Sequence, residues 1–437
     1  MLDKISSFPI ANLIRNKSIQ NFIFLAIIQA SNVLISLISM PLLIQGIGVD
    51  QFGLVNLALS VVIMANIFVS FGFNLSAPRD VAINQSNKDE LSHLVSNIFS
   101  GKIILAFFTS ILILVGIFGL GMFEGYQTIL IFSLFMLFSE ATLPLWFFQG
   151  MEKMKLISIG NVFSKLLFLL GIVLFIHKPD QAKWVNFLLA GSAFSINVLL
   201  LFYIHYELGI TFYKPKFNKI FASLKSNILF FLSLLASHIS VNGGLIVLSF
   251  FASSTILGMF SLAEKIGMVL RMFPALVIQA IYPNASKLYN QDRPKFYSYA
   301  LKTAKWALVI GAIVSFGTFL MAPIIIKLLS KKELPEAVDF LRILAFVPML
   351  ACLNNLNVLL FLVKDQKNLM FRSSWLACLF MVVSSFFLTM YYGGVGLSFA
   401  LISTEVFVFV VSLIINFKHN INDLKSLLKL SLGRKDS

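Results

Sequence analysis

The chain has 437 residues, of which 58% are hydrophobic and 12% are charged, with a mean hydropathy of +0.90 and a formal net charge of +15. Water-soluble domains carry about 45–50% apolar and about 25% charged residues, so this composition excludes a soluble globular enzyme, a disordered chain and a fibrous protein. The basic residues fall between apolar segments instead of gathering with aromatics on one soluble face, so we expect no nucleic-acid partner. The sequence therefore predicts a polytopic membrane protein.

The residue types that carry most enzyme chemistry are sparse or scattered. The two cysteines, Cys352 and Cys378, lie in apolar stretches, which excludes a disulfide framework and a thiolate-rich metal site. The five histidines include no pair at metal-ligand spacing, and the chain lacks a G-x-x-x-x-G-K-[ST] phosphate loop. We therefore expect no metal, no cofactor, no catalytic residue and no ATP hydrolysis by the protein itself.

The N-terminal segment, residues 1–19, is interpreted as a cytoplasmic or interfacial leader. It lacks the 7–15-residue apolar core and the small-residue cleavage site of a secretory signal. Its apolar residues alternate with Lys4, Arg15 and Lys17, as in a short amphipathic segment at a membrane surface. A flexible leader without such a role is the alternative.

From residue 20 onward, the sequence predicts an all-α membrane protein with twelve transmembrane helices. A hydrocarbon core of about 30 Å requires roughly 20 apolar residues per helix, and long continuous apolar runs exclude a β-barrel. The twelve stretches are 21–45, 52–78, 103–122, 128–148, 155–177, 184–205, 227–251, 255–283, 304–328, 338–362, 372–391 and 393–416.

The distribution of Lys and Arg supports this number and orients the chain. If both termini are cytoplasmic, the inner segments hold 25 of the 34 basic residues and the outer loops hold 5. Positively charged loops remain on the cytoplasmic side, so the asymmetry indicates twelve helices with both ends inside. Lys102 is counted here among the inner loop residues.

An internal duplication divides the chain into two six-helix lobes. Residues 20–205 form the predicted N-lobe, 206–226 a basic cytoplasmic linker, 227–416 the C-lobe and 417–437 a basic cytoplasmic tail. A shift of 205 places residues 53–58 (Gly-Leu-Val-Asn-Leu-Ala) on 258–263 (Gly-Met-Phe-Ser-Leu-Ala) and Pro78 on Pro283. A slightly different shift places 151–153 on 365–367. Such parallel repeats are typical of alternating-access transporters, whereas chance similarity among apolar helices is the alternative.

Four ionisable residues lie near the middle of predicted helices: Glu140, Lys165, Arg271 and Glu405. A charge at the bilayer centre costs roughly 2.5–3.5 kcal/mol or more, so it normally faces a hydrated cavity or a partner. One interpretation is a charged cavity for a substrate. The other is that acid and base neutralise one another and hold helices together, which is equally plausible for Glu140 and Lys165. Arg271 is the strongest functional candidate because of its depth.

Further charged residues accompany these four. Glu264 and Lys265 lie one or two turns from Arg271 on the same predicted helix, with Glu264 on the face of Arg271. We expect Arg342 to form a structural pair with Asp339 three residues earlier.

Three other polar residues are weaker candidates. His238 lies in the seventh predicted helix and could couple a proton, although a lone histidine in a helix is more often a packing residue. Arg79, followed by Asp80, lies at the cytoplasmic end of the second predicted helix. An arginine fork there could bind a phosphate, and a helix-end anchor is the alternative.

Two segments resemble a known family. Residues 73–80 (Phe-Asn-Leu-Ser-Ala-Pro-Arg-Asp) and 144–154 (Pro-Leu-Trp-Phe-Phe-Gln-Gly-Met-Glu-Lys-Met) are similar to stretches typical of Wzx-type O-antigen flippases. These belong to the polysaccharide transporter family of the multidrug/oligosaccharidyl-lipid/polysaccharide exporter superfamily. The resemblance spans roughly residues 20–416. Pro78 departs from the pattern, because relatives more often carry Thr there.

The resemblance implies a lipid-linked oligosaccharide flippase of the bacterial inner membrane. Such a protein would move undecaprenyl-pyrophosphate-linked oligosaccharide, in lipopolysaccharide or related polysaccharide biosynthesis, from the cytoplasmic to the periplasmic leaflet, with H⁺ or Na⁺ as a possible coupling ion. Membrane lipid, a polysaccharide polymerase and a chain-length regulator are the other expected partners. A pyrophosphate cannot cross hydrocarbon unaided, so the carrier needs a hydrated cationic cavity. The predicted substrate-binding residues are Arg271, Lys265, Lys165 and Arg79.

The acidic residues and one histidine would tune the charge of that cavity or couple an ion. They are Glu264, Glu140, Glu405, Asp80 and His238. A multidrug or small-solute antiporter of the same superfamily is the second hypothesis, although its cavity would need to be dominated by acids. A membrane glycosyltransferase or a polysaccharide polymerase is the third, and it lacks the large outer loop that such enzymes use.

Overall fold

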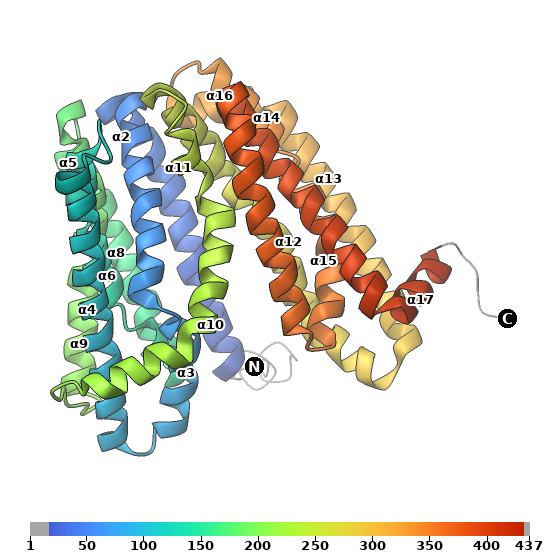
Figure 1. Ribbon diagram of the computed structural model, residues 1–437, viewed down its shortest axis with the longest axis horizontal. Helices are drawn as coiled ribbons and strands as arrows, with labels where there is room; N and C mark the ends of the chain where they lie inside the picture. Colours follow the sequence, from blue (N-terminus) through green and yellow to red (C-terminus); the bar gives the residue numbers. More distant parts are fainter. Residues whose placement is uncertain (1–16, 432–437) are drawn as a thin grey trace, which may run out of the picture. The chain divides into compact units, whose positions relative to one another are not determined.

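The computed structural model describes residues 17–431, and within this range every regular element is a helix (Figure 1). The first half contains α2 (Lys17–Ser70), α3 (Phe73–Asn84), α4 (Lys88–Leu120), α5 (Gln127–Ser133), α6 (Phe135–Thr142), α7 (Leu145–Gly150), α8 (Met154–Phe175) and, after a 3-10 turn at Pro179–Gln181, α9 (Ala182–Tyr206). Almost all of the predicted leader and the end of the predicted tail lie outside the described residues.

The second half begins with α10 (Phe217–Asn242) and α11 (Gly244–Leu248). It continues with α12 (Ser254–Gln291), α13 (Arg293–Ser330), α14 (Pro335–Leu344), α15 (Val347–Val363), α16 (Lys367–His419) and α17 (Ile421–Ser431). The chain forms two compact units, one up to Leu235 and one from Ala236 onward. The boundary between the units therefore falls inside α10.

Ten helical segments of the described chain are long and apolar enough to cross a membrane. Two of them are far longer than one crossing, namely Ile23–Asn84 with 62 residues and Lys367–His419 with 53. Each contains two of the predicted stretches and is bent at a glycine with non-helical backbone angles: φ 83°, ψ 167° at Gly48 and φ 56°, ψ −133° at Gly393. Only glycine adopts such angles at little cost.

Several predicted stretches are interrupted where the local sequence opposes a helix. The stretch 52–78 breaks at Phe71 and Gly72, which both have positive φ. The stretch 128–148 breaks at Leu143, which is extended at φ −68° and ψ 112° because Pro144 follows it. The stretch 227–251 ends its first helix at Asn242 and continues as the short α11.

In the first unit, the two segments that carry the family resemblance pack against each other. Phe73 and Ala77 of α3 share one buried cluster with Trp146, Phe147 and Phe148 at the beginning of α7. A glycine makes this approach possible on the α7 side: a Cβ atom at Gly150 would lie 2.5 Å from the backbone oxygen of Pro78. The long helix α2 of this unit packs on α8, and α8 packs on α9.

In the second unit, α12 contacts α13, α14 and α15, while α16 packs on α15 and α17 on α13. The side chain of Ser253 accepts the backbone N–H of Ile256 and caps α12, and Asp292 caps α13 by accepting the N–H of Lys295. Caps of this kind satisfy N–H groups that have no partner within the helix.

Equivalent turns occur in the two units at the ends of α7 and α15. Glu152 and Asp365 both have φ 53°, and in both turns the following residue donates its N–H to the carbonyl five residues earlier at 2.9 Å. These turns coincide at a shift of 213, so the sequence match of 151–153 with 365–367 is wrong by one residue. The apolar residues around these turns do not determine how the two segments align, whereas the hydrogen bonds of the turns do.

Candidate functional site

A polar cavity of about 210 Å³ lies inside the first unit, surrounded by α2, α6, α8 and α9. Two of the predicted site residues, Glu140 and Lys165, line this cavity. The other polar side chains in its wall are amides and hydroxyls: Asn32, Asn66, Ser139, Asn161, Ser164 and Asn197. In a helical bundle with apolar outer faces, such a cavity is suited to water or to a polar ligand.

Glu140 is held by donors from two other helices. Its Oε1 accepts hydrogen bonds from Lys102 Nζ on α4 at 3.4 Å and from Asn74 Nδ2 on α3 at 3.2 Å. The Lys102 side chain is fully buried, and that of Glu140 is 19% exposed. Lys102, and not Lys165, therefore neutralises Glu140.

Lys165 lies on α8 and lines the same cavity as Glu140. Among residues 17–431, no carboxylate lies within ion-pair distance of its ammonium group. Asn161 precedes it by one helical turn on the same face and accepts a hydrogen bond from Ser31 at 2.9 Å. The three side chains Lys102, Glu140 and Lys165 thus comprise two bases and one acid, of which Glu140 and Lys165 line the cavity.

Two amide oxygens of the cavity wall have unused hydrogen-bonding capacity. Asn32 Oδ1 and Asn66 Oδ1 are buried and have no donor among the described residues. By contrast, Asn197 donates to the carbonyl of Ser139 at 2.9 Å. Buried polar atoms without partners are rare in proteins, so the wall of this cavity offers acceptors as well as the Lys165 ammonium group.

In the second unit, the structure joins two predicted site residues directly. Arg271 Nη2 on α12 lies 3.1 Å from Glu405 Oε1 on α16, and the two side chains are 25% and 19% exposed. Arg271 Nε is buried without an acceptor. Half-buried guanidinium groups of this kind can exchange one oxyanion for another, because their fork binds carboxylate and phosphate alike.

Glu264 and Lys265 lie two turns before Arg271 on α12. Glu264 is buried, and its Oε1 has no hydrogen-bond donor in the described part of the chain. Lys265 is half-buried beside it. Glu264, Lys265 and Arg271 thus lie on the single helix α12, and α16 contributes Glu405 as the ion-pair partner of Arg271.

The remaining predicted residues lie apart from these two clusters. His238 on α10 contacts the side chain of Asn242 one turn later, at 3.4 Å between Nδ1 and Nδ2. Arg79 is exposed on α3 and Asp80 is half-buried, and neither forms an ion pair within residues 17–431. Arg342 pairs with Asp339 at 3.8 Å, which confirms the expected structural pair.

Lys102 is the main residue that the sequence analysis missed. It was assigned to a cytoplasmic loop, but α4 begins at Lys88, fifteen residues earlier than the predicted stretch 103–122. The signal was present: Asn87 caps the helix by accepting the N–H of Glu90. Leu91, Val95, Ile98 and Lys102 then follow at helical spacing on one buried face.

Lys165, Arg79 and Glu140 belong to the first unit, whereas Arg271, Lys265, Glu264, Glu405 and His238 belong to the second. Each unit thus contains charged side chains of its own, paired as Lys102–Glu140 in the first and Arg271–Glu405 in the second. The expectation that the two sets face one common cavity stays a prediction.

Comparisons with known proteins agree with this architecture. The model of the family described as "Polysaccharide biosynthesis protein" matches residues 18–289. The chain is 25% identical over 402 residues to an Escherichia coli K12 protein named "Putative O-antigen transporter", covering 92% of this chain and 96% of that one. A Shigella dysenteriae protein of the same name is 24% identical over 393 residues, covering 89% and 97%.

Solved structures show the same fold. An inward-facing multidrug resistance MATE family transporter of the MOP superfamily superposes with a TM-score of 0.69 at 15% identity, covering 94% of this chain and 99% of its own. The lipid II flippase MurJ in an inward closed conformation gives 0.66 at 14% identity, with 95% and 94% covered. The chain thus has the fold of the MOP superfamily transporters, and because the family model matches more than half of its length, it belongs to the polysaccharide biosynthesis protein family.

Proposed function

We propose that this protein is a flippase for lipid-linked oligosaccharide. It moves an undecaprenyl-pyrophosphate-linked repeat unit, such as an O-antigen unit, from the cytoplasmic to the periplasmic leaflet of the bacterial inner membrane by alternating access. The near full-length likeness to two O-antigen transporters carries this proposal. The charged interior of the helical bundle supplies the chemistry that such a task requires.

The physical demand on a flippase is to keep a diphosphate and its sugars hydrated or bound while the polyprenyl tail remains in lipid. Burial of unpaired ionised groups in hydrocarbon costs tens of kcal/mol in the Born limit. Lys165 offers an ammonium group that no carboxylate of the described residues 17–431 pairs with, and the amides of the cavity wall offer partners for sugar hydroxyls. Arg271 offers a second cation, which Glu405 holds until an oxyanion of the substrate competes for it.

We assign Arg271, Lys265, Lys165 and Arg79 to substrate binding and Glu264, Glu405, Asp80 and His238 to charge tuning or ion coupling. Glu140, which lines the cavity of the first unit, instead orients Lys102 and Asn74 by accepting a hydrogen bond from each. H⁺ or Na⁺ is the candidate coupling ion, and a polysaccharide polymerase and a chain-length regulator are the candidate partners.

The membrane topology that fits this function has twelve spans in a six-plus-six arrangement with both termini in the cytoplasm. A straight 53-residue helix would be about 80 Å long, against a hydrocarbon core of about 30 Å. We infer that the bends at Gly48 and Gly393 each separate two spans, and on this proposal the ten helical segments of the described chain correspond to twelve crossings.

The test is reconstitution of the purified protein into liposomes that contain lipid-linked oligosaccharide. A membrane-impermeant reagent that modifies the sugar reports how much substrate reaches the outer leaflet. We expect the wild type to expose the inner pool and Arg271→Ala to slow that exposure at least tenfold. Absence of any exchange by the wild type, together with protein-dependent drug resistance in cells, would instead support the multidrug antiporter. Chemical change in the lipid-linked sugar would support a glycosyltransferase or polymerase.

A further inference from the structure

A second cavity, distinct from the charged interior, lies in the second unit beneath the C-terminal helix α17. Its volume is about 300 Å³, and it is bounded by α13, α15, α16 and α17. Eight of its nine lining side chains are apolar, the ninth being Asn357. A cavity half that size lined by aliphatic and aromatic groups takes up an apolar ligand such as benzene, so this one is suited to a hydrocarbon chain.

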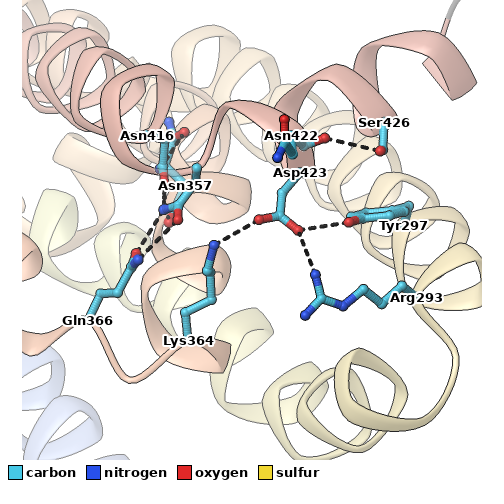
Figure 2. Close-up of polar contacts among 10 residues, drawn as sticks. Arg293, Tyr297, Asn357, Lys364, Gln366, Asn416, Asn422, Asp423 and Ser426 are labelled. Carbon is cyan, nitrogen blue, oxygen red and sulfur yellow. Dashed lines mark hydrogen bonds and ion pairs between the residues drawn. The ribbon is translucent and has the colours of Figure 1, made fainter.

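The roof of this cavity is fixed by a buried polar cluster, which Figure 2 shows. The Asp423 carboxylate of α17 accepts hydrogen bonds from Tyr297 Oη at 2.7 Å and from Lys364 Nζ at 2.9 Å, and Arg293 Nη1 lies 3.9 Å away. The Asp423 side chain is 4% exposed. Because an unpaired buried carboxylate is costly, these partners hold α17 against α13 and the end of α15.

An amide ladder fixes the corner between α16 and α17 in the same way. Asn420 and Gln366 exchange two hydrogen bonds at 2.7 and 3.0 Å. Asn416 donates to Asn357 Oδ1 at 3.1 Å, as seen beside the Asp423 cluster in Figure 2. The side-chain oxygen of Asn357, the one polar residue of the cavity wall, thus already accepts a hydrogen bond, so the cavity is apolar in character.

The α17 helix has the pattern of a segment that lies at a membrane surface. Leu424 and Leu427 face the cavity and are buried, whereas Ile421 and Leu430 are 44% and 42% exposed. Apolar residues on an exposed flank, combined with an exposed lysine such as Lys425, are typical of interfacial amphipathic helices. The cavity therefore lies close to the level of lipid headgroups.

The charges around this cavity favour an anionic headgroup. Lys305, Lys418 and Lys425 are exposed, and each lies within one helical turn of a residue that lines the cavity. Residues 417–431 contain three lysines and one carboxylate, Asp423, which is already bonded within the cluster. Basic groups at this depth attract acidic lipids.

We propose that this cavity binds one acyl chain of an anionic phospholipid, with the lipid phosphate held by the exposed lysines of α13, α16 and α17. The site is independent of the transported substrate and lies at the C-terminal end of the second unit. It would anchor α17 to the membrane through a specific lipid in addition to the polar cluster.

The experiment is native mass spectrometry of the full-length protein in detergent, titrated with phosphatidylglycerol or with phosphatidylcholine of the same acyl chains. We expect one tightly bound phosphatidylglycerol, at least tenfold preferred over phosphatidylcholine. Leu413→Trp fills the cavity and should weaken that binding at least tenfold, whereas Leu379→Trp, an exposed position on the same helix α16, should not. Lys418→Gln combined with Lys425→Gln should remove the headgroup preference.

Three results would overturn the proposal: equal binding of the two lipids, unchanged binding in Leu413→Trp, or tighter binding of undecaprenyl phosphate than of phosphatidylglycerol at this site. If Leu413→Trp does not fold, as judged by gel filtration, the smaller change Leu413→Phe provides the same comparison. Failure of lipid binding leaves the liposome transport assay unaffected, so the two proposals are tested separately.

Discussion

Lys165 is a half-buried cation of the first unit without a carboxylate partner among residues 17–431, and this makes it the sharpest test of the substrate cavity. We expect Lys165→Gln to lower transport of lipid-linked oligosaccharide about 10–100-fold, because a charge-assisted hydrogen bond contributes about 1.5–3 kcal/mol. Lys165→Arg should retain most activity. Lys155→Gln, an exposed position on the same helix, is the matched control.

The measurement is the O-antigen ladder of lipopolysaccharide in a strain that lacks its own flippase, with protein levels checked in the membrane fraction. Wild-type ladders from Lys165→Gln would show that this lysine does not contact the substrate.

The Lys102–Glu140 pair has a structural role, and a mutant cycle distinguishes that role from binding. Lys102→Met leaves a carboxylate uncompensated in the interior, so we expect a loss of about 3–5 kcal/mol in stability. Lys102→Met combined with Glu140→Gln removes both charges and should recover most of it. Thermal unfolding of the purified variants in detergent measures this difference. If the double variant is less stable than the single one, the pair does not act as a neutralising unit.

Individual charges were foreseen from the sequence more readily than their partners. A lysine or glutamate within an apolar run is visible in the sequence, as Glu140, Lys165 and Arg271 were. Which acid meets which base depends on how helices face one another, and helix period alone does not decide that. The unsatisfied oxygens of Asn32 and Asn66 are likewise a property of packing, since neutral amides are common in membrane helices.

At the scale of elements, the contact between α3 and α7 depends on a glycine. A methyl group at Gly150 would meet the Pro78 oxygen at 2.5 Å and Val81 Cβ at 2.6 Å, and neither the backbone nor a β-branched side chain can move away easily. We expect Gly150→Ala to cost about 1–3 kcal/mol by overpacking. A lower melting temperature in detergent would show this, with Gly317→Ala, where a Cβ meets no atom within 4 Å, as the control.

The existence of the helices was predictable from hydropathy, whereas their breaks depend on local signals that hydropathy does not contain, such as Pro144 after Leu143. Apolar runs of about twenty residues identified every long helix, because the membrane imposes that length. The interruptions at Phe71, Leu143 and Asn242 arise from local backbone geometry and tertiary contacts that hydropathy does not contain. Lys102 was placed in a loop for a related reason. The helix α4 begins at Lys88, well before the apolar stretch, because Asn87 caps its N-terminus, and a hydropathy profile does not detect such a cap.

At the scale of the whole molecule, the proposed topology makes a direct prediction about accessibility. Lys331 would lie outside the cell membrane and Asp292 inside it. A cysteine placed at Lys331 should react with a membrane-impermeant maleimide in intact spheroplasts, whereas one at Asp292 should react only after permeabilisation. The native Cys352 and Cys378 are buried and give a low background. Reaction of both positions from the same side would contradict an odd number of spans between them.

The helix α10 crosses the boundary between the two units. Its Phe231 stacks on Phe71 with ring centroids 4.4 Å apart and meets Phe68 edge-on at 5.2 Å. The first part of α10, up to Leu235, therefore packs within the first unit. Protease cleavage in the connection before α10, between residues 207 and 216, should therefore leave two fragments that co-purify. Continuity of the peptide bond there is then dispensable for assembly, and the protein could be expressed as a split pair.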